Sequence, residues 1–311
     1  MPEEAMPDDG PELLIVGASG RVGRLLAAHW AWERAPVCLQ TRGDPITPAL
    51  PSLRWAPLED GPEALAAGLD GRGGAGSVRA MVMLAGVTPS SPGGGGDLAL
   101  NARLAEACVT AAAAAGIGRV LLASSAAVYG GGRDVPWRED EAAGTPPTAY
   151  GAAKRAMEAA ATKAAAKVAT EAAARGDGPG ICCLRIGNVA GADALLLNAG
   201  GEGQHFIDRF ASGGGPVRSY IGPVSLARVI ETLARAPELP EVLNVAAPAP
   251  VAMADLARAA GGDWRWRPAP PDAVERFTLD CSALRRLLHF APAESTAGEM
   301  VAQWRACGGG R

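Results

Sequence analysis

Residues 13 to 26 read LLIVGASGRVGRLL, and this stretch decides the fold class. Four apolar residues predict a short buried strand, and the residues after the last glycine predict an amphipathic helix. Between them, three glycines follow the spacing GxxGxxG. Such a turn lets a diphosphate approach the backbone closely, and the amides at the helix N-terminus stabilise its charge. The stretch therefore predicts a dinucleotide site, with the cofactor contacting Gly17, Ser19, Gly20, Arg21, Val22 and Gly23.

The position of the glycines carries this prediction, because the spacing alone is weak in a chain with 41 glycines. Gly68, Gly71 and Gly74 show the same spacing, but they follow a helical stretch and open no helix. A phosphate-binding turn needs a strand before it and a helix after it. The second triplet is therefore interpreted as a loop.

Short apolar runs alternate with helical stretches along the first two thirds of the chain. The runs LLIV, VCLQ, VRAMVMLAG, RVLLASS and ICCLRIGNV are apolar throughout, as in strands covered by helices on both faces. This order predicts an α/β fold, a Rossmann doubly wound parallel sheet. We expect a disordered tail over 1–12, a core over 13–190 and a small substrate-binding subdomain over 191–311, interleaved with the last core elements. The Gly-rich stretches GRGGAG and SSPGGGG are predicted to be loops.

Composition narrows the class of protein. The formal net charge is -4 over 311 residues, with both signs interspersed, which gives no reason to expect nucleic acid or a membrane surface as a partner. The N-terminus lacks the features of a secretory signal, no run of eighteen apolar residues occurs, and the six cysteines are interpreted as reduced thiols. We therefore expect a soluble cytoplasmic protein. The three histidines lie far apart, so no metal site is predicted.

The end of the second predicted strand indicates which cofactor is bound. About 20 residues after the glycine turn, an acidic residue would favour an unphosphorylated ribose. Here the sequence reads LQTRGD, with Thr41 and Arg42 at that place. An arginine pairs with a 2'-phosphate, and Arg21 would add a second charge, so NADP is preferred over NAD. NAD stays possible, because Asp44 is an alternative partner for the ribose.

Four segments in order resemble the extended short-chain dehydrogenase/reductase family, the NAD(P)-dependent epimerases and dehydratases. They are GASGRVG, then SSAAVYG at 124–130, YGAAK at 150–154 and LRIGNVAG at 184–191. The resemblance implies a Rossmann core, a small C-terminal substrate domain and a homodimer formed by the stretches 98–115 and 149–175.

Further segments are similar to the family's motifs. MLAG at 83–86 and Asn101 in the following helix resemble its cofactor contacts, which implies that Leu84, Ala85 and Gly86 line the site. Asn188 and Arg218, the latter in RSYI, match positions that contact a nucleotide-linked sugar. By this resemblance they are candidate substrate ligands, although a strand end and a surface arginine are the plainer interpretations.

Tyr150 and Lys154 are the candidate catalytic pair. Residues four apart on a helix share one face, and an adjacent ammonium favours the ionised form of a phenol. Tyr150 would act as acid and base, and the resemblance implies that Lys154 also holds the nicotinamide ribose. Ser125 matches the family's serine or threonine and would bind the same substrate oxygen; Ser124 is the less favoured neighbour.

These residues support three hypotheses. The first is an oxidoreductase that transfers hydride at a carbonyl or alcohol carbon of a sugar-derived or other small substrate. A nucleotide-sugar epimerase or dehydratase with retained cofactor is the second. The third is an NADP-sensing or scaffold protein without catalysis, which would have no need of Ser125, Tyr150 and Lys154 together.

Overall fold

The computed structural model describes residues 10–70, 77–89, 96–141, 148–171, 178–197 and 205–310. Most of the predicted tail, the stretch GRGGAG and most of SSPGGGG lie outside these ranges. Within them, no helix has the length and apolar character that crossing a bilayer would require.

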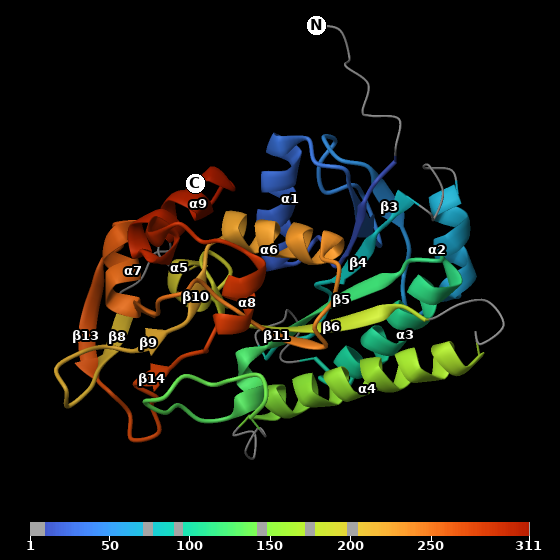
Figure 1. Ribbon diagram of the computed structural model, residues 1–311. Coiled ribbons are helices and arrows are strands. Elements are labelled where there is room, and N and C mark those ends of the chain that lie inside the picture. The colour runs from blue at the N-terminus through green and yellow to red at the C-terminus, as the bar shows by residue number, and fades with distance from the viewer. Residues whose placement is uncertain are drawn as a thin grey trace, which may run out of the picture.

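A parallel sheet forms the centre of the molecule (Figure 1). Among the described residues it has seven strands in the order β11-β6-β5-β4-β1-β2-β3, and every neighbouring pair is parallel. The order changes direction at β1, as in a doubly wound sheet. The strands are β1 (Leu13–Val16), β2 (Val37–Thr41), β3 (Ser52–Arg54), β4 (Ala80–Met83), β5 (Arg119–Ser125), β6 (Gly180–Ile186) and β11 (Val242–Val245).

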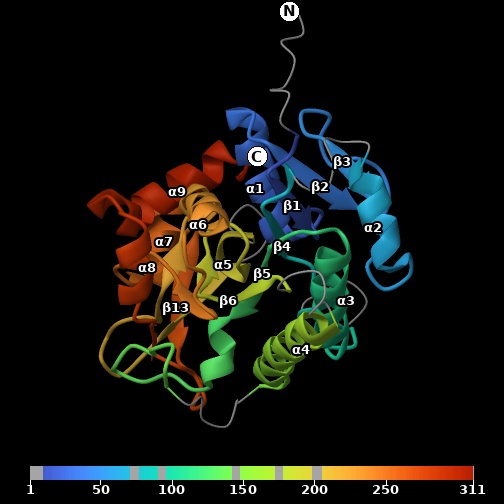
Figure 2. The ribbon, with the colours of Figure 1, turned by 45° about the vertical axis from the view of Figure 1, so that its right-hand side comes forward.

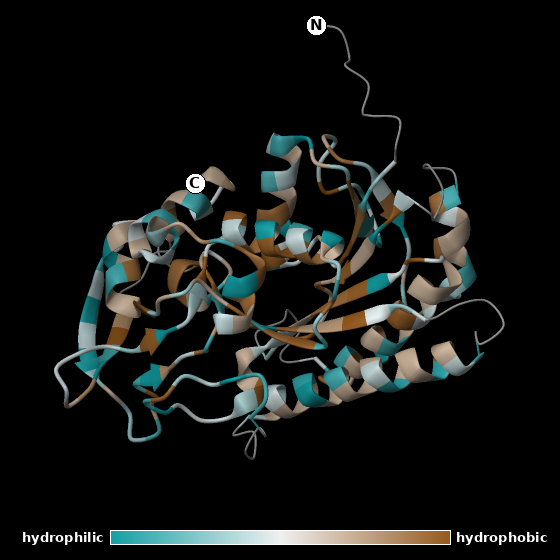
Figure 3. Cartoon of the chain, viewed as in Figure 1, coloured by the Kyte–Doolittle hydropathy of each residue, from teal (hydrophilic) through white to brown (hydrophobic). Residues whose placement is uncertain are grey.

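Helices cover both faces of this sheet, because its strands are apolar on both sides (Figures 2 and 3). One face packs against the first set of helices through a core that includes Trp30 and Leu226, and the other packs against the second set around Val109 and Met157. The predicted Rossmann fold is therefore confirmed. The first set is α1 (Arg21–Glu33), α6 (Pro223–Arg235) and α8 (Ser282–Leu287), and the second is α2 (Gly61–Asp70), α3 (Leu100–Ala114) and α4 (Ala149–Glu171).

The C-terminal part adds small sheets beside the main one. Each is built from segments far apart in sequence, and a separate core around Leu256 and Trp304 supports them. Its strands are β7 (Asn188–Val189), β8 (His205–Arg209), β9 (Val217–Arg218), β10 (Tyr220–Ile221), β12 (Val251–Ala252), β13 (Trp264–Pro268) and β14 (Arg276–Phe277). Its helices are α5 (Ala194–Leu197), α7 (Met253–Ala260), η3 (Pro292–Ser295) and α9 (Ala297–Ala306).

The strand register gathers the chain's motifs at one edge. Val16 pairs with Met83 and Met83 pairs with Leu122, so β1 and β4 end together. Ser125 pairs with Ile186, so β5 and β6 also end together, three residues further along. Because the strands are parallel, the segments that follow them meet outside their carboxyl ends, where ligands bind in such sheets.

Gly17 permits the closest approach at this edge. Its φ is +87°, and a Cβ built there would lie 2.4 Å from the backbone nitrogen of Ala85. We predict that Gly17→Ala lowers the free energy of unfolding by roughly 2 to 4 kcal/mol, from left-handed strain and a backbone clash combined.

The control is Gly116→Ala in the turn after α3. Gly116 also has a positive φ, +69°, but nothing lies within 4 Å of its added Cβ. Gly116→Ala should therefore lower the free energy of unfolding by only about 1 kcal/mol, from the left-handed strain alone. Denaturant unfolding of both variants tests this, and equal losses would contradict the close approach.

Candidate active site

Each of the three glycines in the turn has a different structural role. Gly17 makes the close approach to Ala85, and Gly20 is the N-cap of α1. A Cβ on Gly23 would lie 2.6 Å from Ala18, so this glycine lets the helix pack on the turn. No side chain caps the N-terminus of α1, which leaves the helix end to an anion. The turn therefore fits a dinucleotide diphosphate.

Gln40 supports the turn from β2, and only its place before Thr41 could have indicated this from the sequence. Its side chain is buried; Oε1 accepts a hydrogen bond from the amide of Gly17 at 2.9 Å, and Nε2 donates to the carbonyl of Trp55. Gln40 therefore connects the turn to the end of β3.

Arg42 directly follows β2 and is exposed on the surface. It lines an open hollow of about 440 Å³ with Arg54, Glu59 and Asp60. Thr41 is turned inward, and its hydroxyl accepts from the amide of Gly43 and donates to the carbonyl of Asp44, both at 3.1 Å. The hollow thus presents two arginines and two carboxylates.

Arg21 is directed elsewhere. Its Nη2 lies 3.4 Å from the hydroxyl oxygen of Thr88, in the segment after β4, and its charge also acts on Tyr150. Arg21 therefore reaches from the start of α1 toward the segment after β4. It is not among the residues that line the hollow with Arg42.

The segment after β4 forms the opposite wall of the candidate site. The amides of Leu84 and Ala85 donate to the carbonyl of Val16, at 2.8 and 2.9 Å. A Cβ on Gly86 would lie 2.7 Å from Oδ1 of Asn101 and 3.5 Å from Nζ of Lys154. Gly86 is therefore the residue at which the segment after β4 meets Lys154, the candidate catalytic lysine.

Asn101 holds this wall in place. It is fully buried on α3, its Oδ1 accepts from the amide of Val87 at 2.8 Å, and its Nδ2 donates to the carbonyl of Val87 at 3.0 Å. Both ends of its amide are thus engaged by one loop residue.

Ser125 and Tyr150 come together from two elements. Ser125 ends β5 and caps the 3₁₀ helix η2 (Ala126–Tyr129), while Thr148 accepts from the amide of Gly151 at 3.1 Å where α4 begins. Burial raises the pKa of Tyr150, while the Ser125 side chain and the positive charge of Arg21 oppose that rise. Without a cofactor, the phenol is therefore kept protonated.

Lys154 is buried beneath Tyr150 on the next turn of α4. Its side chain is 4% exposed, its Nζ donates to the carbonyl of Ala123 at 2.7 Å, and it lies 5.9 Å from the centre of the Tyr150 ring. Burial lowers the pKa of Lys154 to about 8, and the negative charge of Glu158 opposes this effect. A lysine with such a pKa is poised to change its charge near neutrality.

The candidate substrate residues occupy a neighbouring strand and a separate small sheet. Asn188 follows two residues after Ile186, which pairs with Ser125, and it pairs in register with Tyr220. The hydroxyl of Tyr220 donates to Oδ2 of Asp193 at 2.5 Å, and the Asn188 side chain lowers the pKa of Tyr220 against the larger effect of burial. Asn188 is therefore at the same edge as Ser125.

Arg218 is partly committed to the backbone. Its Nη1 donates to the carbonyls of Val217 and Glu275, and its Nη2 donates to the carbonyl of Val274, over 2.6 to 3.0 Å. Three of the five N–H groups of this guanidinium thus anchor β9 to the segment before β14. Burial lowers the pKa of Arg218.

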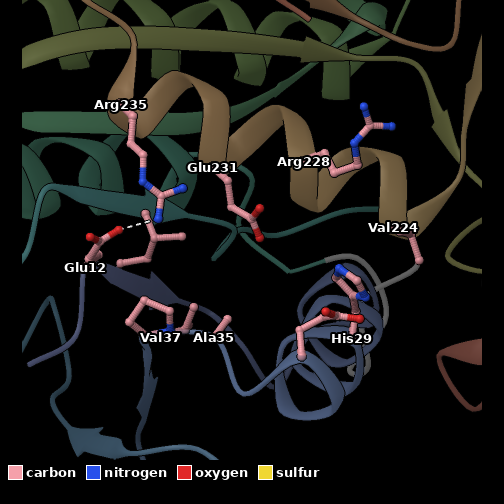
Figure 4. Close-up of a pocket in the computed structure, with 11 residues that line it drawn as sticks. Glu12, His29, Ala35, Val37, Val224, Arg228, Glu231 and Arg235 are labelled. Atoms are coloured by element: carbon pink, nitrogen blue, oxygen red, sulfur yellow. Dashed lines mark hydrogen bonds and ion pairs between the residues drawn. The ribbon is translucent and has the colours of Figure 1, made fainter. Parts of the chain in front are cut away.

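A second cavity lies at the opposite edge of the sheet, between α1 and α6 (Figure 4). It measures about 330 Å³, and Leu13 and Val37, the first residues of β1 and β2, help to line it. Glu12 and Arg235 form an ion pair across its rim. None of the predicted site residues lines it, so the carboxyl edge is the candidate active site.

Comparison with known proteins agrees with this geometry. The family model "NAD dependent epimerase/dehydratase family" matches residues 13–219. No curated protein matches the chain when sequences are compared.

Several solved structures are similar in fold. MoeE5 in complex with UDP-glucuronic acid and NAD is 22% identical, with a TM-score of 0.70 over 94% of this chain and 99% of that one. UDP-glucose-4-epimerase from Stenotrophomonas maltophila with bound NAD and formylated UDP-arabinopyranose is 19% identical, with a TM-score of 0.71 over 96% and 99%. The NAD-dependent NDP-hexosamine 5,6-dehydratase TunA is 20% identical, with a TM-score of 0.67 over 94% and 97%.

The family match covers about two thirds of the chain and includes the glycine turn, Ser125, Tyr150 and Lys154. The solved structures share the Rossmann fold with this chain over nearly the whole length of the chain. The chain therefore belongs to the NAD-dependent epimerase/dehydratase family, in the extended branch of the short-chain dehydrogenases/reductases, and is an enzyme of that nicotinamide-dependent type.

Proposed function

We propose that the chain is an NADP-preferring oxidoreductase that acts on a carbonyl or alcohol carbon of a sugar-derived or other small substrate. The observation that carries the proposal is the meeting of Ser125, Tyr150 and Lys154 beside Gly86, at the edge where the glycine turn opens. A bound nicotinamide would supply the hydride acceptor or donor. The protein supplies the proton and the orientation.

Tyr150 is the proposed acid and base. Ser125 lies close enough to the Tyr150 hydroxyl to lower its pKa, so we expect both hydroxyls to reach one substrate oxygen. The ammonium of Lys154 and the guanidinium of Arg21 favour the phenolate as the proton leaves, because both are positive charges near the ring. Asn188 and the remaining N–H groups of Arg218 are proposed to hold the substrate.

Sugar-nucleotide epimerisation or dehydration is the second candidate. It is supported by the relatives whose names include UDP-sugars or an NDP-hexosamine dehydratase activity. An epimerase returns the hydride to its substrate and consumes no cofactor, whereas a reductase consumes one NADPH per turnover. The amount of NADPH consumed per amount of product formed therefore distinguishes a reductase from an epimerase.

The proposed homodimer would use α3 and α4. These helices pack side by side on one face of the sheet (Figures 1 and 2), and the family resemblance implies that their outer faces pair with a second copy.

Tyr150→Phe tests the acid and base. This variant keeps the ring and removes only the hydroxyl, so we expect turnover to fall by about 10²-fold to 10⁴-fold, the usual contribution of such a group. Affinity for NADPH should change by no more than a few fold. The assay uses the best substrate from a screen of small carbonyl compounds and nucleotide sugars. Turnover equal to that of the native protein would remove Tyr150 from the mechanism.

Arg42→Gln tests the cofactor preference. Arg42 and Arg54 share one hollow, so a 2'-phosphate there would gain charge-assisted hydrogen bonds. Loss of one such bond should weaken NADPH binding about tenfold and leave NADH binding unchanged. Calorimetric titration of both cofactors measures this.

The matched control is Arg285→Gln, which removes the same charge from the exposed surface of α8. It should leave both affinities unchanged. Tighter binding of NADH than of NADPH by the native protein would overturn the preference.

A further inference from the structure

Glu158 and Arg185 form an enclosed ion pair behind the candidate catalytic residues. Both side chains are 13% exposed. Arg185 donates from Nε to Oε1 of Glu158 at 3.1 Å and from Nη2 to Oε2 at 2.9 Å, a two-point contact between β6 and α4. An enclosed pair with this geometry is rigid, because separating the two side chains would leave an unpaired charge in the interior, which is energetically costly.

The pair is connected to both sides of the catalytic centre. Glu158 lies one helical turn beyond Lys154 on α4, and its Oε1 accepts from the hydroxyl of Ser124 at 2.5 Å. Ser124 directly precedes Ser125. The carboxylate of Glu158 is thus fixed to the strand that ends in one candidate catalytic residue and to the helix that carries the other two.

Arg185 extends the connection past Ser125. Its Nη1 donates to the hydroxyl of Tyr129 at 3.1 Å, and its guanidinium carbon lies 4.9 Å from the centre of that ring. Tyr129 ends the 3₁₀ helix that Ser125 begins, and its hydroxyl donates to Oδ1 of Asn244 on β11 at 2.7 Å. Residues on both sides of Ser125 are therefore held by the same ion pair.

The charges around Lys154 come from several elements. Tyr150 and Glu158 lie on its own helix. Strand β5 contributes the Ala123 carbonyl. Strand β6 contributes the Cys183 thiol and Arg185, which is paired with Glu158. The fourth element is the segment after β4, which contributes the backbone at Gly86. Burial raises the pKa of Cys183 to about 12, so this thiol is neutral where Lys154 titrates. Glu158 is then the negative charge that stabilises the ammonium.

We propose that Glu158 and Arg185 are positioning residues: the pair fixes α4 against the end of β5, and the carboxylate keeps Lys154 charged beside Tyr150. The importance of this for catalysis rests on the function proposed above. The electrostatic part does not, because it concerns Lys154 in the protein without substrate.

The test is a direct titration of Lys154. The chain has only three lysines, Lys154, Lys163 and Lys167, and the last two are exposed on the same helix. In protein labelled with ¹³C-lysine, the Cε shifts give three titration curves by NMR, assigned with Lys163→Arg and Lys167→Arg. Lys154 should titrate near pH 8 in the native protein.

The two partners should move this midpoint in opposite directions. Glu158→Gln removes the negative charge and leaves Arg185 positive, so the midpoint should fall by about one unit or more, the usual effect of a nearby charge. Arg185→Gln leaves Glu158 unpaired, so the midpoint should rise. Glu158→Asp keeps the charge and should restore most of the native value. Lys163 and Lys167 should not move.

A matched control is Glu294→Gln. Glu294 pairs with Arg228 at 2.7 Å on the other face of the sheet, so its loss disturbs an ion pair without touching α4. It should leave the Lys154 midpoint unchanged. Circular dichroism checks that each variant is folded, and Arg185→Gln and Glu158→Asp keep the test decisive if Glu158→Gln does not fold.

A Lys154 midpoint that stays within experimental error in every folded variant would overturn the electrostatic role. The positioning role is tested by turnover of Glu158→Gln and Glu158→Asp with the screened substrate. We expect a fall in kcat at unchanged KM for Glu158→Gln, with its alkaline limb displaced to lower pH, and rescue by Glu158→Asp. Equal kcat in the native protein and Glu158→Gln across the pH range would overturn it. Failure of Tyr150→Phe to lose turnover would instead contradict the proposed function alone.

Discussion

The close approach of two backbone segments at the carboxyl edge is the constraint on which the rest of the site depends. Gly17 and Ala85 follow adjacent strands, and only a residue without a Cβ fits between them. This contact places the N-terminus of α1 beside the segment that contains Gly86. Gly86 in turn has no side chain to separate the cofactor wall from Asn101 and Lys154. Two glycines thus bring the candidate diphosphate site and a buried amine to one edge of the sheet.

The buried amine is the costly part of this arrangement. Removing an ammonium from water disfavours its charged form, which is why the pKa of Lys154 falls to about 8. The Ala123 carbonyl and the carboxylate of Glu158 offset part of that penalty, and Arg185 keeps the carboxylate in place. A group held at this balance responds to small changes in neighbouring charge, as acid and base chemistry near neutrality requires.

Much of the fold was predictable from the sequence, because the signals for it are local. LLIVGASGRVGRLL contains a strand, a turn and the start of a helix in fourteen residues, and the structure confirms all three. The edge strands were harder. β3 is only three residues long and β11 is a four-residue run late in the chain, so neither is long enough to show a clear periodic pattern. The pairing of β8 with β13 joins distant segments, which no local pattern can predict.

The candidate site shows the same division. Tyr150 and Lys154 were found because they share one helix face, and Gly17, Gly20 and Gly23 because they share one turn. Gln40, Glu158 and Arg185 were missed, because their roles depend on contacts across 23 to 27 positions of sequence. Arg218 was predicted to bind the substrate from its motif, and no local pattern indicated that its guanidinium also anchors a backbone segment.

A crystal structure of the protein with NADPH would show directly whether the carboxyl edge holds the cofactor. We expect the diphosphate at the N-terminus of α1, the nicotinamide beside Tyr150 and Ser125, and Nζ of Lys154 turned from the Ala123 carbonyl to the ribose hydroxyls. A nicotinamide bound away from Tyr150, or a cofactor seated anywhere other than the glycine turn, would contradict this expectation.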